Sequence, residues 1–469
     1  MDIDNFEILI KEKKEYENLL HSLHFSIQIG KFNNSIQLIK KLRHSKFRNQ
    51  NFFYNIAFLF FQKENYVKAS YILKKLEKKY GFNEKASNLL IESLILSENY
   101  NEAKKIIDKV LSFNSSSVFS FYSLGIIHLE LGNLKEAKKN FLSSITIKKD
   151  YAPSHYQLSR ITKCKKKNKY LKRLDDLSEK SSIKDKPFFL FSLAKYYDDL
   201  KDYKSALFYL KKANHLKNKD SKKFRIIDII RNCKFKRKLV FINKQKISSQ
   251  INNIFIVGMP RTGSTLVENI FSMNPVFKIG GETGLVENCI FRQKIVKGKL
   301  DAFLLNNTYN RLFLNPQKKE KLTDKSLLDF FNLPILINSF PNCKVIETVR
   351  NKNEVIWSIY KNNFQSNSLN FSYSLENIRR LYNYYEKVMK YFKKKYPGRI
   401  LTISYEDFIK NPNKQSKKIY DFCQLAWDNS YLNFQKKKIP IKSSSNSQLR
   451  DKIYKTAERN FENYRKLLS

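Results

Sequence analysis

A short phrase recurs at a fixed period in the first half of the chain, and this repeat constrains the fold more than any other feature. Each copy places an aromatic residue or leucine three positions before a small residue; the small residues are Ser35, Ala69, Ala103, Ala137 and Ala206. The first three steps are 34 residues long, and the last gap of 69 residues leaves room for one degenerate copy around residues 170–171. A period of this length is typical of stacked helix pairs, so the sequence predicts six of them.

A second set of small residues supports the pairing of helices. It stands twelve positions before the first set in four of the six units, at Ala57, Gly125, Ser159 and Ala194, with Leu23 and Ile91 as exceptions. Close packing of two helices at paired small positions explains this spacing. The pattern over residues 15–216 resembles tetratricopeptide repeats, which implies a solenoid whose concave surface binds a peptide or partner protein. The alternative is that the repeats serve only as a scaffold or as a dimer interface.

The segment that follows is rich in lysine around an apolar patch at residues 224–230. We interpret it as a capping helix and then a linker. The expected organisation is a helical solenoid with its capping helix over residues 15–234, a linker over 235–250 and a second domain over 251–469.

The second half alternates short β-branched runs, at residues 254–257, 344–349 and 400–404, with helical patterns. This alternation predicts an α/β domain with a central parallel sheet. Ligands of such sheets bind beyond the carboxyl ends of the strands, where Arg261 and Arg350 would both arrive. Two arginines at one edge indicate a ligand with two separated anionic groups.

The first of those strands runs into a loop with Gly258, Gly263 and Thr265 in the pattern of a phosphate-binding P-loop. In that pattern, backbone N–H groups and the following helix N-terminus hold phosphate oxygens, and a lysine reaches the outer phosphates of a triphosphate. Ser264 occupies the position of that lysine. The loop is therefore P-loop-like and predicts an anion site, but not hydrolysis of ATP or GTP.

Several short motifs follow one another along the second half of the chain. They are residues 260–266, 281–283, 323–325, 340–342, 349–350 with Ser358, 404–407, and 448–450 with Tyr454. Residues 251–466 resemble sulfotransferases, most closely the bacterial type fused to tetratricopeptide repeats, and are similar also to protein-tyrosine sulfotransferases. The resemblance implies that a sulfuryl group moves from 3'-phosphoadenosine 5'-phosphosulfate (PAPS) to a hydroxyl or phenol. Peptide tyrosine and carbohydrate are both open as acceptors.

The resemblance also implies roles for single residues. Glu282 matches the base that takes the acceptor's proton, and Lys325 matches the lysine that stabilises charge during transfer. Arg261 is assigned both to catalysis and to donor binding. The other implied donor-binding residues are Thr262, Gly263, Ser264, Thr265, Leu266, Arg350, Ser358, Tyr405, Ser445, Gln448 and Tyr454. No metal-binding cluster is visible in the sequence, and no metal is expected.

Two positions depart from the family pattern. Asn460 stands where the family has a basic residue, so donor affinity is left open at this position, where Arg459 or Lys455 is the candidate substitute. Asn351 stands in place of an aspartate and is expected to cost a loop cap rather than catalysis. The first change leaves open an alternative function, a repeat-based interaction scaffold with an inactive transferase domain.

Charge and cysteine content limit which partners and which cellular compartment are expected. Lysine and arginine number 89 against 43 acids, for a formal net charge of +46 that runs through both halves. We interpret most of this charge as solvated surface, so nucleic acid is the less favoured partner. The five scattered cysteines predict buried thiols in a reducing compartment. Without a secretory leader or an apolar run near the ~20 residues of a membrane span, a cytoplasmic protein is expected.

Overall fold

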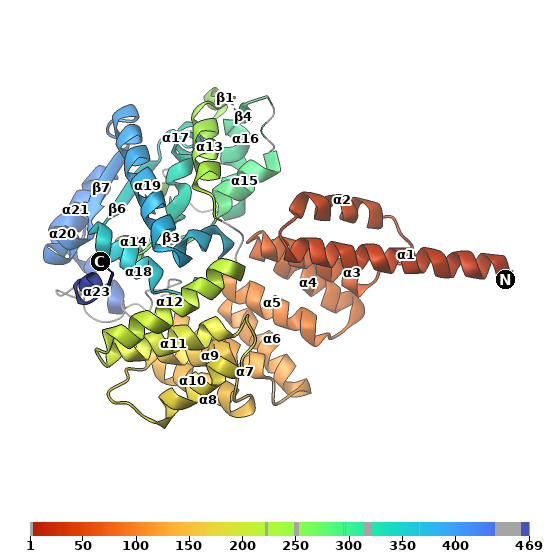
Figure 1. Cartoon of the computed structure of the whole chain (residues 1–469). Coiled ribbons are helices and arrows are strands. Elements are labelled where there is room, and N and C mark those ends of the chain that lie inside the picture. The colour runs from red at the N-terminus through yellow and green to blue at the C-terminus, as the bar shows by residue number, and fades with distance from the viewer. Residues whose placement is uncertain are drawn as a thin grey trace. The chain divides into compact units, whose positions relative to one another are not determined.

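The structure, a computed structural model, describes residues 3–220, 224–247, 253–293, 295, 297–313, 321–364, 366–436 and 461–468. The chain divides into two compact units (Figure 1). One unit consists of residues 1–128 and 135–149, and the other consists of residues 129–134 and 150–469.

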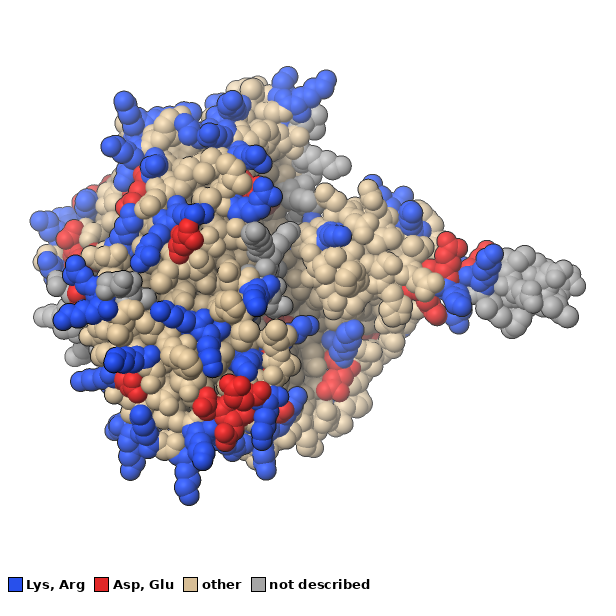
Figure 2. All heavy atoms as spheres, viewed as in Figure 1, with Lys and Arg blue, Asp and Glu red and all other residues tan. Residues whose placement is uncertain are grey.

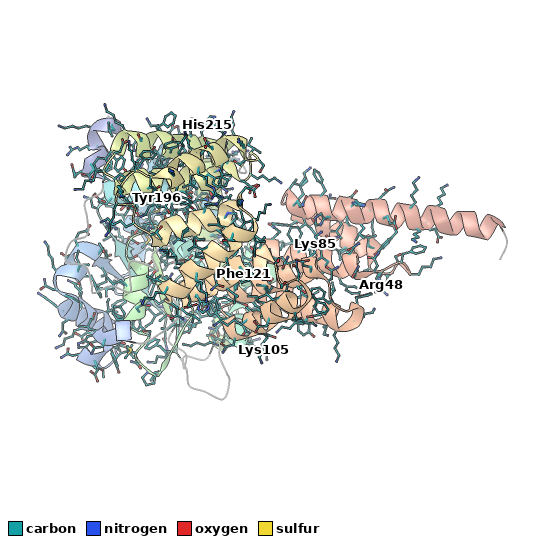
Figure 3. All side chains as sticks on the ribbon, turned by 90° about the horizontal axis from the view of Figure 1, so that it is seen from below. Arg48, Lys85, Lys105, Phe121, Tyr196 and His215 are labelled. Atoms are coloured by element: carbon teal, nitrogen blue, oxygen red, sulfur yellow. The ribbon has the colours of Figure 1, made fainter. Side chains whose placement is uncertain are left out.

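Six helix pairs form the repeat region, as the period predicts. They are α1 (Ile3–Gln28) with α2 (Phe32–Leu42), α3 (Gln50–Gln62) with α4 (Tyr66–Tyr80), α5 (Glu84–Leu96) with α6 (Tyr100–Phe113), α7 (Val118–Glu130) with α8 (Leu134–Ile147), α9 (Ala152–Ile161) with α10 (Lys169–Lys180), and α11 (Lys186–Asp199) with α12 (Tyr203–Asp220). The last two pairs belong to the second unit. Figure 3 shows the side chains of the repeat region, with Phe121 on α7 and Tyr196 on α11.

In five of the six pairs, the recurring phrase begins at the turn between the two helices. Its first residue has a left-handed backbone, with φ of 71° at Gly30, 58° at Glu64, 63° at Glu98, 78° at Gly132 and 60° at Lys201. After α3, the N–H of Glu64 donates to the carbonyl of Phe61 and the N–H of Asn65 to that of Phe60, at 2.8 and 2.9 Å. These bonds end a helix through a left-handed residue. The repeated phrase is therefore a helix stop followed by the start of the next helix.

The paired small residues are buried between the helices, which confirms the close packing expected from the sequence. Ala69, Ala103 and Ala137 are fully buried. At Gly125 an added Cβ would lie 2.4 Å from the ring of Phe141, so this position accepts no larger residue unless the ring moves. The residues predicted to follow as a capping helix form α13 (Ile226–Arg237).

The second unit holds a five-stranded parallel sheet. Its strands, in spatial order, are β3 (Phe277–Ile279), β5 (Lys321–Asp324), β2 (Ile254–Gly258), β6 (Lys344–Val349) and β7 (Ile400–Ser404). The strands expected from the sequence are β2, β6 and β7, and all three are confirmed. A second, two-stranded parallel sheet pairs β1 (Val240–Ile242) with β4 (Lys299–Asp301). The first of these two strands lies within the segment expected to be a linker.

Helices and short 3₁₀ segments surround the sheet. They are η1 (Lys244–Lys246), α14 (Ser264–Asn269), α15 (Leu285–Gln293), α16 (Ala302–Phe313), η2 (Leu327–Asn332), α17 (Leu333–Ser339), α18 (Lys352–Tyr360), η3 (Asn367–Tyr373), α19 (Leu375–Lys395), α20 (Tyr405–Lys410), α21 (Pro412–Phe422), η4 (Asn429–Lys436) and α23 (Glu462–Leu468). Helices on both faces are typical of parallel sheets, whose strands read as continuous apolar runs. The alternation of strand and helix patterns in the sequence is explained by this arrangement.

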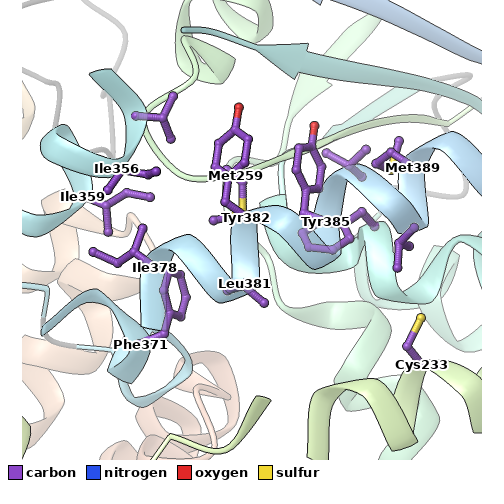
Figure 4. Packing of buried hydrophobic residues seen from close by; sticks show 14 of the residues in the cluster. Cys233, Met259, Ile356, Ile359, Phe371, Ile378, Leu381, Tyr382, Tyr385 and Met389 are labelled. Atoms are coloured by element: carbon purple, nitrogen blue, oxygen red, sulfur yellow. The ribbon is translucent and has the colours of Figure 1, made fainter. Parts of the chain in front are cut away.

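Both faces of the sheet are buried, in two separate clusters. Ile254 and Ile256 pack with α14, α20 and α21, whereas Phe255 and Val257 pack with α18 and α19 on the opposite face. Figure 4 shows part of the second cluster, around Met259 and the tyrosines of α19. This cluster also contains apolar residues of the last repeats: Tyr156, Leu190, Phe191, Ala194, Ala206, Leu207, Leu210 and Ala213. The last repeats and the sheet therefore share one hydrophobic core.

The five cysteines are buried thiols, as expected. Lysine and arginine side chains are spread over the face of the molecule seen in Figure 2. Among the helices that the structure describes, none has the length and apolar character needed to cross a bilayer.

Candidate functional site

The topology of the sheet brings the charged residues of interest to one edge. Because all five strands run parallel, their carboxyl ends meet at the same edge. In spatial order, that edge carries Glu282 after β3, Lys325 after β5, Arg261 after β2, Arg350 after β6 and Tyr405 after β7. The P-loop-like segment thus lies between an acid–base pair on one side and an arginine on the other.

Two glycines allow the loop to follow its path. Gly258 has φ of 150°, and a Cβ there would lie 2.6 Å from the carbonyl oxygen of Thr348. Gly263 has φ of 89°, and a Cβ there would lie 2.5 Å from the ring of Tyr405. Other residues fit neither position without moving backbone or ring. The backbone of the loop is therefore held close against β6 and the start of α20.

The hydroxyl of Thr262 is used inside the loop. It donates to the carbonyl of Met259 at 2.8 Å and shares a 2.7 Å hydrogen bond with the hydroxyl of Thr348. Ser264 and Thr265 follow in the first turn of α14, and Leu266 packs into the core beneath it. Thr262 thus fixes the loop to β6, whereas the next two hydroxyl residues begin the helix.

Arg261 is the central cation of the site. Its Nε donates to the hydroxyl of Ser358 at 3.0 Å, across 97 positions of sequence. Burial lowers its pKa, and the positive charges of Arg160 and Arg350 act in the same direction, so that its pKa is about 10. Its backbone is left-handed, with φ of 73°. A left-handed residue other than glycine carries strain, which proteins tend to keep at functional sites.

Arg350 lies beside Arg261 and faces an aromatic ring. Its guanidinium is 4.8 Å from the ring centroid of Tyr405, and its Nη2 is 3.8 Å from the carboxylate of Glu354. With the hydrogen bond from Arg261 to Ser358, the structure brings together the two arginines, Ser358 and Tyr405. The sequence separates the first and last of these residues by 144 positions.

The expectation that Asn351 costs a loop cap is wrong. Its side-chain oxygen accepts hydrogen bonds from the N–H groups of Asn353 and Glu354, at 3.1 and 3.2 Å, and so caps α18. Asparagine has the same short acceptor as aspartate at this position and is an equally good N-cap. The substitution removes a negative charge but keeps the cap.

Glu282 and Lys325 form an ion pair at the other side of the loop. Nζ of Lys325 is 3.1 Å from Oε1 of Glu282, and the N–H of Lys325 donates to the carbonyl of Gly281 at 2.8 Å. The lysine side chain is fully buried, whereas that of Glu282 is 50% exposed. The carboxylate is therefore the member of the pair that an incoming molecule can reach.

A buried carboxylate, Glu268, lies beneath this pair and has no counterpart in the sequence analysis. Its Oε1 accepts from the N–H of Gly281 at 3.0 Å and from the hydroxyl of Thr323 at 3.1 Å. Burial raises its pKa to about 7, although the charge of Lys325 acts in the opposite direction. Glu268 belongs to α14, so it connects the loop to the turn that carries Glu282. The one signal in the sequence is an acid next to the apolar pair 266–267.

Asp324 forms a second buried polar centre next to Lys325. It accepts hydrogen bonds from the hydroxyls of Tyr309 and Thr283, at 2.6 and 2.7 Å, and from the N–H and hydroxyl of Ser326. Burial raises its pKa above the ordinary value of a carboxyl group. These bonds hold the end of β5 in place and so fix the position of Lys325.

Three predicted donor-binding residues lie outside the described residues: Ser445, Gln448 and Tyr454. The same is true of Asn460 and of its two candidate substitutes. Within the described ranges, no three histidine, cysteine or acidic side chains are grouped so that they could hold a metal ion.

The sheet, its P-loop-like turn and the charged edge define an α/β protein with a candidate anion-binding site. Residues 253–302 and 298–429 match the sulfotransferase family, and residues 120–151 and 189–220 match the tetratricopeptide repeat. The second half of the chain therefore contains a sulfotransferase-family domain, and the first half carries tetratricopeptide repeats.

Two relatives and two solved structures are similar to parts of the chain. An uncharacterized protein of Aquifex aeolicus (strain VF5) is 26% identical over 309 residues, 60% of this chain and 40% of that protein. A putative protein-tyrosine sulfotransferase of Caenorhabditis briggsae is 25% identical over 194 residues, 38% of this chain and 68% of that protein. This chain thus spans less than half the length of the first relative.

The solved structures align more distantly. The sulfotransferase domain of the Synechococcus PCC 7002 olefin synthase has 16% identity and a TM-score of 0.32, over 47% of this chain and 95% of that domain. MamA of Desulfovibrio magneticus RS-1 has 13% identity and a TM-score of 0.28, over 44% of this chain and 94% of that protein.

Proposed function

We propose that the chain transfers a sulfuryl group from PAPS to a hydroxyl or phenol. The observation that carries the proposal is the order of groups along the sheet edge: the Glu282–Lys325 pair, then the loop, then Arg350 with Ser358. PAPS has a phosphosulfate at its 5' end and a phosphate at its 3' position. The loop and Arg350 offer one anion site for each, and the match of residues 253–302 and 298–429 to the sulfotransferase family supports this donor.

The residues present fit the two anionic groups of such a donor. Backbone N–H groups of the loop, with the hydroxyls of Ser264 and Thr265, would hold the 5'-phosphosulfate. Arg350 and Ser358 would hold the 3'-phosphate, because a guanidinium fork bonds two oxygens at once. The ring of Tyr405 lies against both Gly263 and Arg350 and so borders the two anion sites.

Glu282 and Lys325 would carry the chemistry. Glu282 takes the proton of the acceptor as the acceptor oxygen bonds to sulfur, which is worth roughly 10²–10⁴-fold in rate. Lys325 stabilises the negative charge left on the phosphate oxygen as its bond to sulfur breaks. Arg261 adds a second positive charge next to the loop. Proton, sulfuryl group and charge are all accounted for without a metal.

The acceptor and the partners follow as part of the same proposal. Peptide tyrosine and carbohydrate hydroxyls remain the two candidate acceptors, and a peptide or protein partner would bind the concave surface of the repeats. The proposed compartment is the cytoplasm, where five buried thiols stay reduced.

Calorimetric titration with 3',5'-adenosine bisphosphate, 5'-AMP and ATP tests the donor site. We expect the bisphosphate to bind more tightly than either of the others, because it alone offers a 3'-phosphate. Equal binding of all three would contradict the proposal. Absence of binding would favour the alternative of an interaction scaffold with an inactive transferase domain.

A further inference from the structure

Helix α9 of the repeats packs against the end of α18. The N–H of Asn363, just beyond α18, donates to the hydroxyl of Tyr156 on α9 at 3.3 Å. The ring of Tyr156 is buried in the same cluster as Met259 and Ile359. One further repeat helix is tied to this segment, since the side chain of Asn214 on α12 donates to the carbonyl of Tyr360 at 3.0 Å. The repeats thus reach the helix that carries Ser358.

Arg160 lies on the same face of α9 as Tyr156, because residues four apart on a helix are neighbours. Its guanidinium is 5.8 Å from the ring centroid of Tyr156, and its Nη1 donates to Gln157 at 2.8 Å. Because the hydroxyl of Tyr156 contacts the segment after α18, Arg160 lies next to the end of the helix that carries Ser358. In agreement with this, Arg160 lowers the pKa of Arg261 more than Arg350 does.

The surroundings of these arginines carry an excess of positive charge. Burial lowers the pKa of Lys361, and so do the charges of Arg261 and Arg350. The acids that act on Lys361 in the opposite direction are Asp198 and Glu354. Four cations therefore face two carboxylates in this part of the second unit. Like charges held in a partly buried site repel one another, and a bound anion relieves the repulsion.

We infer that Arg160 contacts the 3'-phosphate of the donor, so that the last repeats form one side of the nucleotide site. The inference rests on the proposed function and adds to it a binding residue from outside the sulfotransferase part of the chain. The ligand group is a phosphate dianion, which suits guanidinium groups because each can bond two of its oxygens. Donor binding and the repeat region are then one structural unit.

The test is calorimetry on the full chain with 3',5'-adenosine bisphosphate and 5'-AMP. Arg160→Ala should weaken binding of the bisphosphate about 10- to 100-fold and leave 5'-AMP binding unchanged. Arg160→Lys should give an intermediate loss, because it keeps the charge without the fork. The matched control is Arg173→Ala on α10, an exposed arginine of the same repeats, which should bind both nucleotides like the parent.

A melting curve separates ligand contact from a structural role. Without nucleotide, Arg160→Ala should melt at or above the temperature of the parent, since one repelling charge is gone, and the bisphosphate should raise its melting temperature less. Unchanged binding of the bisphosphate would overturn the inference alone. The inference would also be overturned if the variant melts at a lower temperature and its affinity for both nucleotides falls equally. If the parent binds neither nucleotide, the proposed function fails and this inference fails with it.

Discussion

The contacts that define a repeat lie within one 34-residue period, whereas the candidate site gathers residues from Arg261 to Tyr405. In the repeats, a left-handed turn and a pair of small residues are enough to set each helix pair. In the sheet region, the position of each charged residue depends on strands and helices far away in the sequence. A substitution in the repeats should therefore act locally, and one at the sheet edge should act through the site.

The two regions are not separate at their junction. Helices α9, α11 and α12 belong to the repeats, but their apolar residues complete the core on one face of the sheet. Repeat helices thus pack against one another in the first unit and against the sheet in the second. The chain divides into these units near residue 150. Because the last repeats share a core with the sheet, the place where the chain is cut should decide whether the sheet region folds.

Cutting the chain at two places should give opposite results. A fragment starting at residue 235 loses the repeat side of the shared core, so we expect it to aggregate or to lack a cooperative melting transition. A fragment starting at Asp150 keeps that core and should fold and bind 3',5'-adenosine bisphosphate. Circular dichroism and size-exclusion chromatography distinguish them. Equal melting of both fragments would show that the sheet region folds without the repeats.

Glu282→Gln should lower turnover ~10²–10⁴-fold with little change in donor affinity, because an amide cannot take the acceptor's proton. Slow hydrolysis of the donor can replace transfer until an acceptor is found. The matched control is Glu376→Gln, an exposed acid on α19. If Glu282→Gln transfers at the parental rate while binding the donor normally, Glu282 is not the base.

Glu268 should make stability depend on pH. Its pKa rises from 4.5 in the unfolded chain to about 7 in the folded one, so the folded state binds more protons between these values. Stability of the parent should therefore fall as the pH rises through this window, by about 3 kcal/mol relative to Glu268→Gln. Urea denaturation of both proteins at pH 5 and pH 8 measures the difference. Parallel pH profiles would contradict the role of burial.

Arg350→Ala should remove the preference for a 3'-phosphate. Losing charged hydrogen bonds costs ~1.5–3 kcal/mol, or about 10- to 150-fold in affinity for 3',5'-adenosine bisphosphate, with 5'-AMP unaffected. Calorimetry measures both, and Arg380→Ala on the exposed face of α19 is the control. An equal loss for the two nucleotides would assign Arg350 to another part of the ligand.

Gly125→Ala should have the smallest effect of these changes, and the effect should be confined to the first unit. The new methyl group would press on the ring of Phe141, which should lower the free energy of unfolding by roughly 1–3 kcal/mol. The higher helix propensity of alanine should offset ~1 kcal/mol of this loss. We expect the first unit to melt earlier while binding of 3',5'-adenosine bisphosphate is unchanged. A loss of nucleotide binding would show that the repeats do not act locally.

The six helix pairs and the strands β2, β6 and β7 were predictable from local patterns in the sequence. Both results come from local patterns: a period of one helix pair, and apolar runs long enough to recognise. The strands β3 and β5 have three and four residues, and pairing with their neighbours defines them. The motifs also gave Glu282, Lys325, Arg261, Arg350 and Ser358, whose roles stay predictions, but not the distances between them.

The tertiary structure alone decided how the charges interact. Asn351 keeps its cap because its side chain reaches two N–H groups, which no residue list can show. The raised pKa of Glu268 depends on burial, and the lowered pKa of Arg261 depends on burial and on cations from two distant helical regions. Electrostatic energy follows separation and solvent exposure in space. These quantities are set when the sheet and the last repeats pack together, and the order of residues along the chain does not contain them.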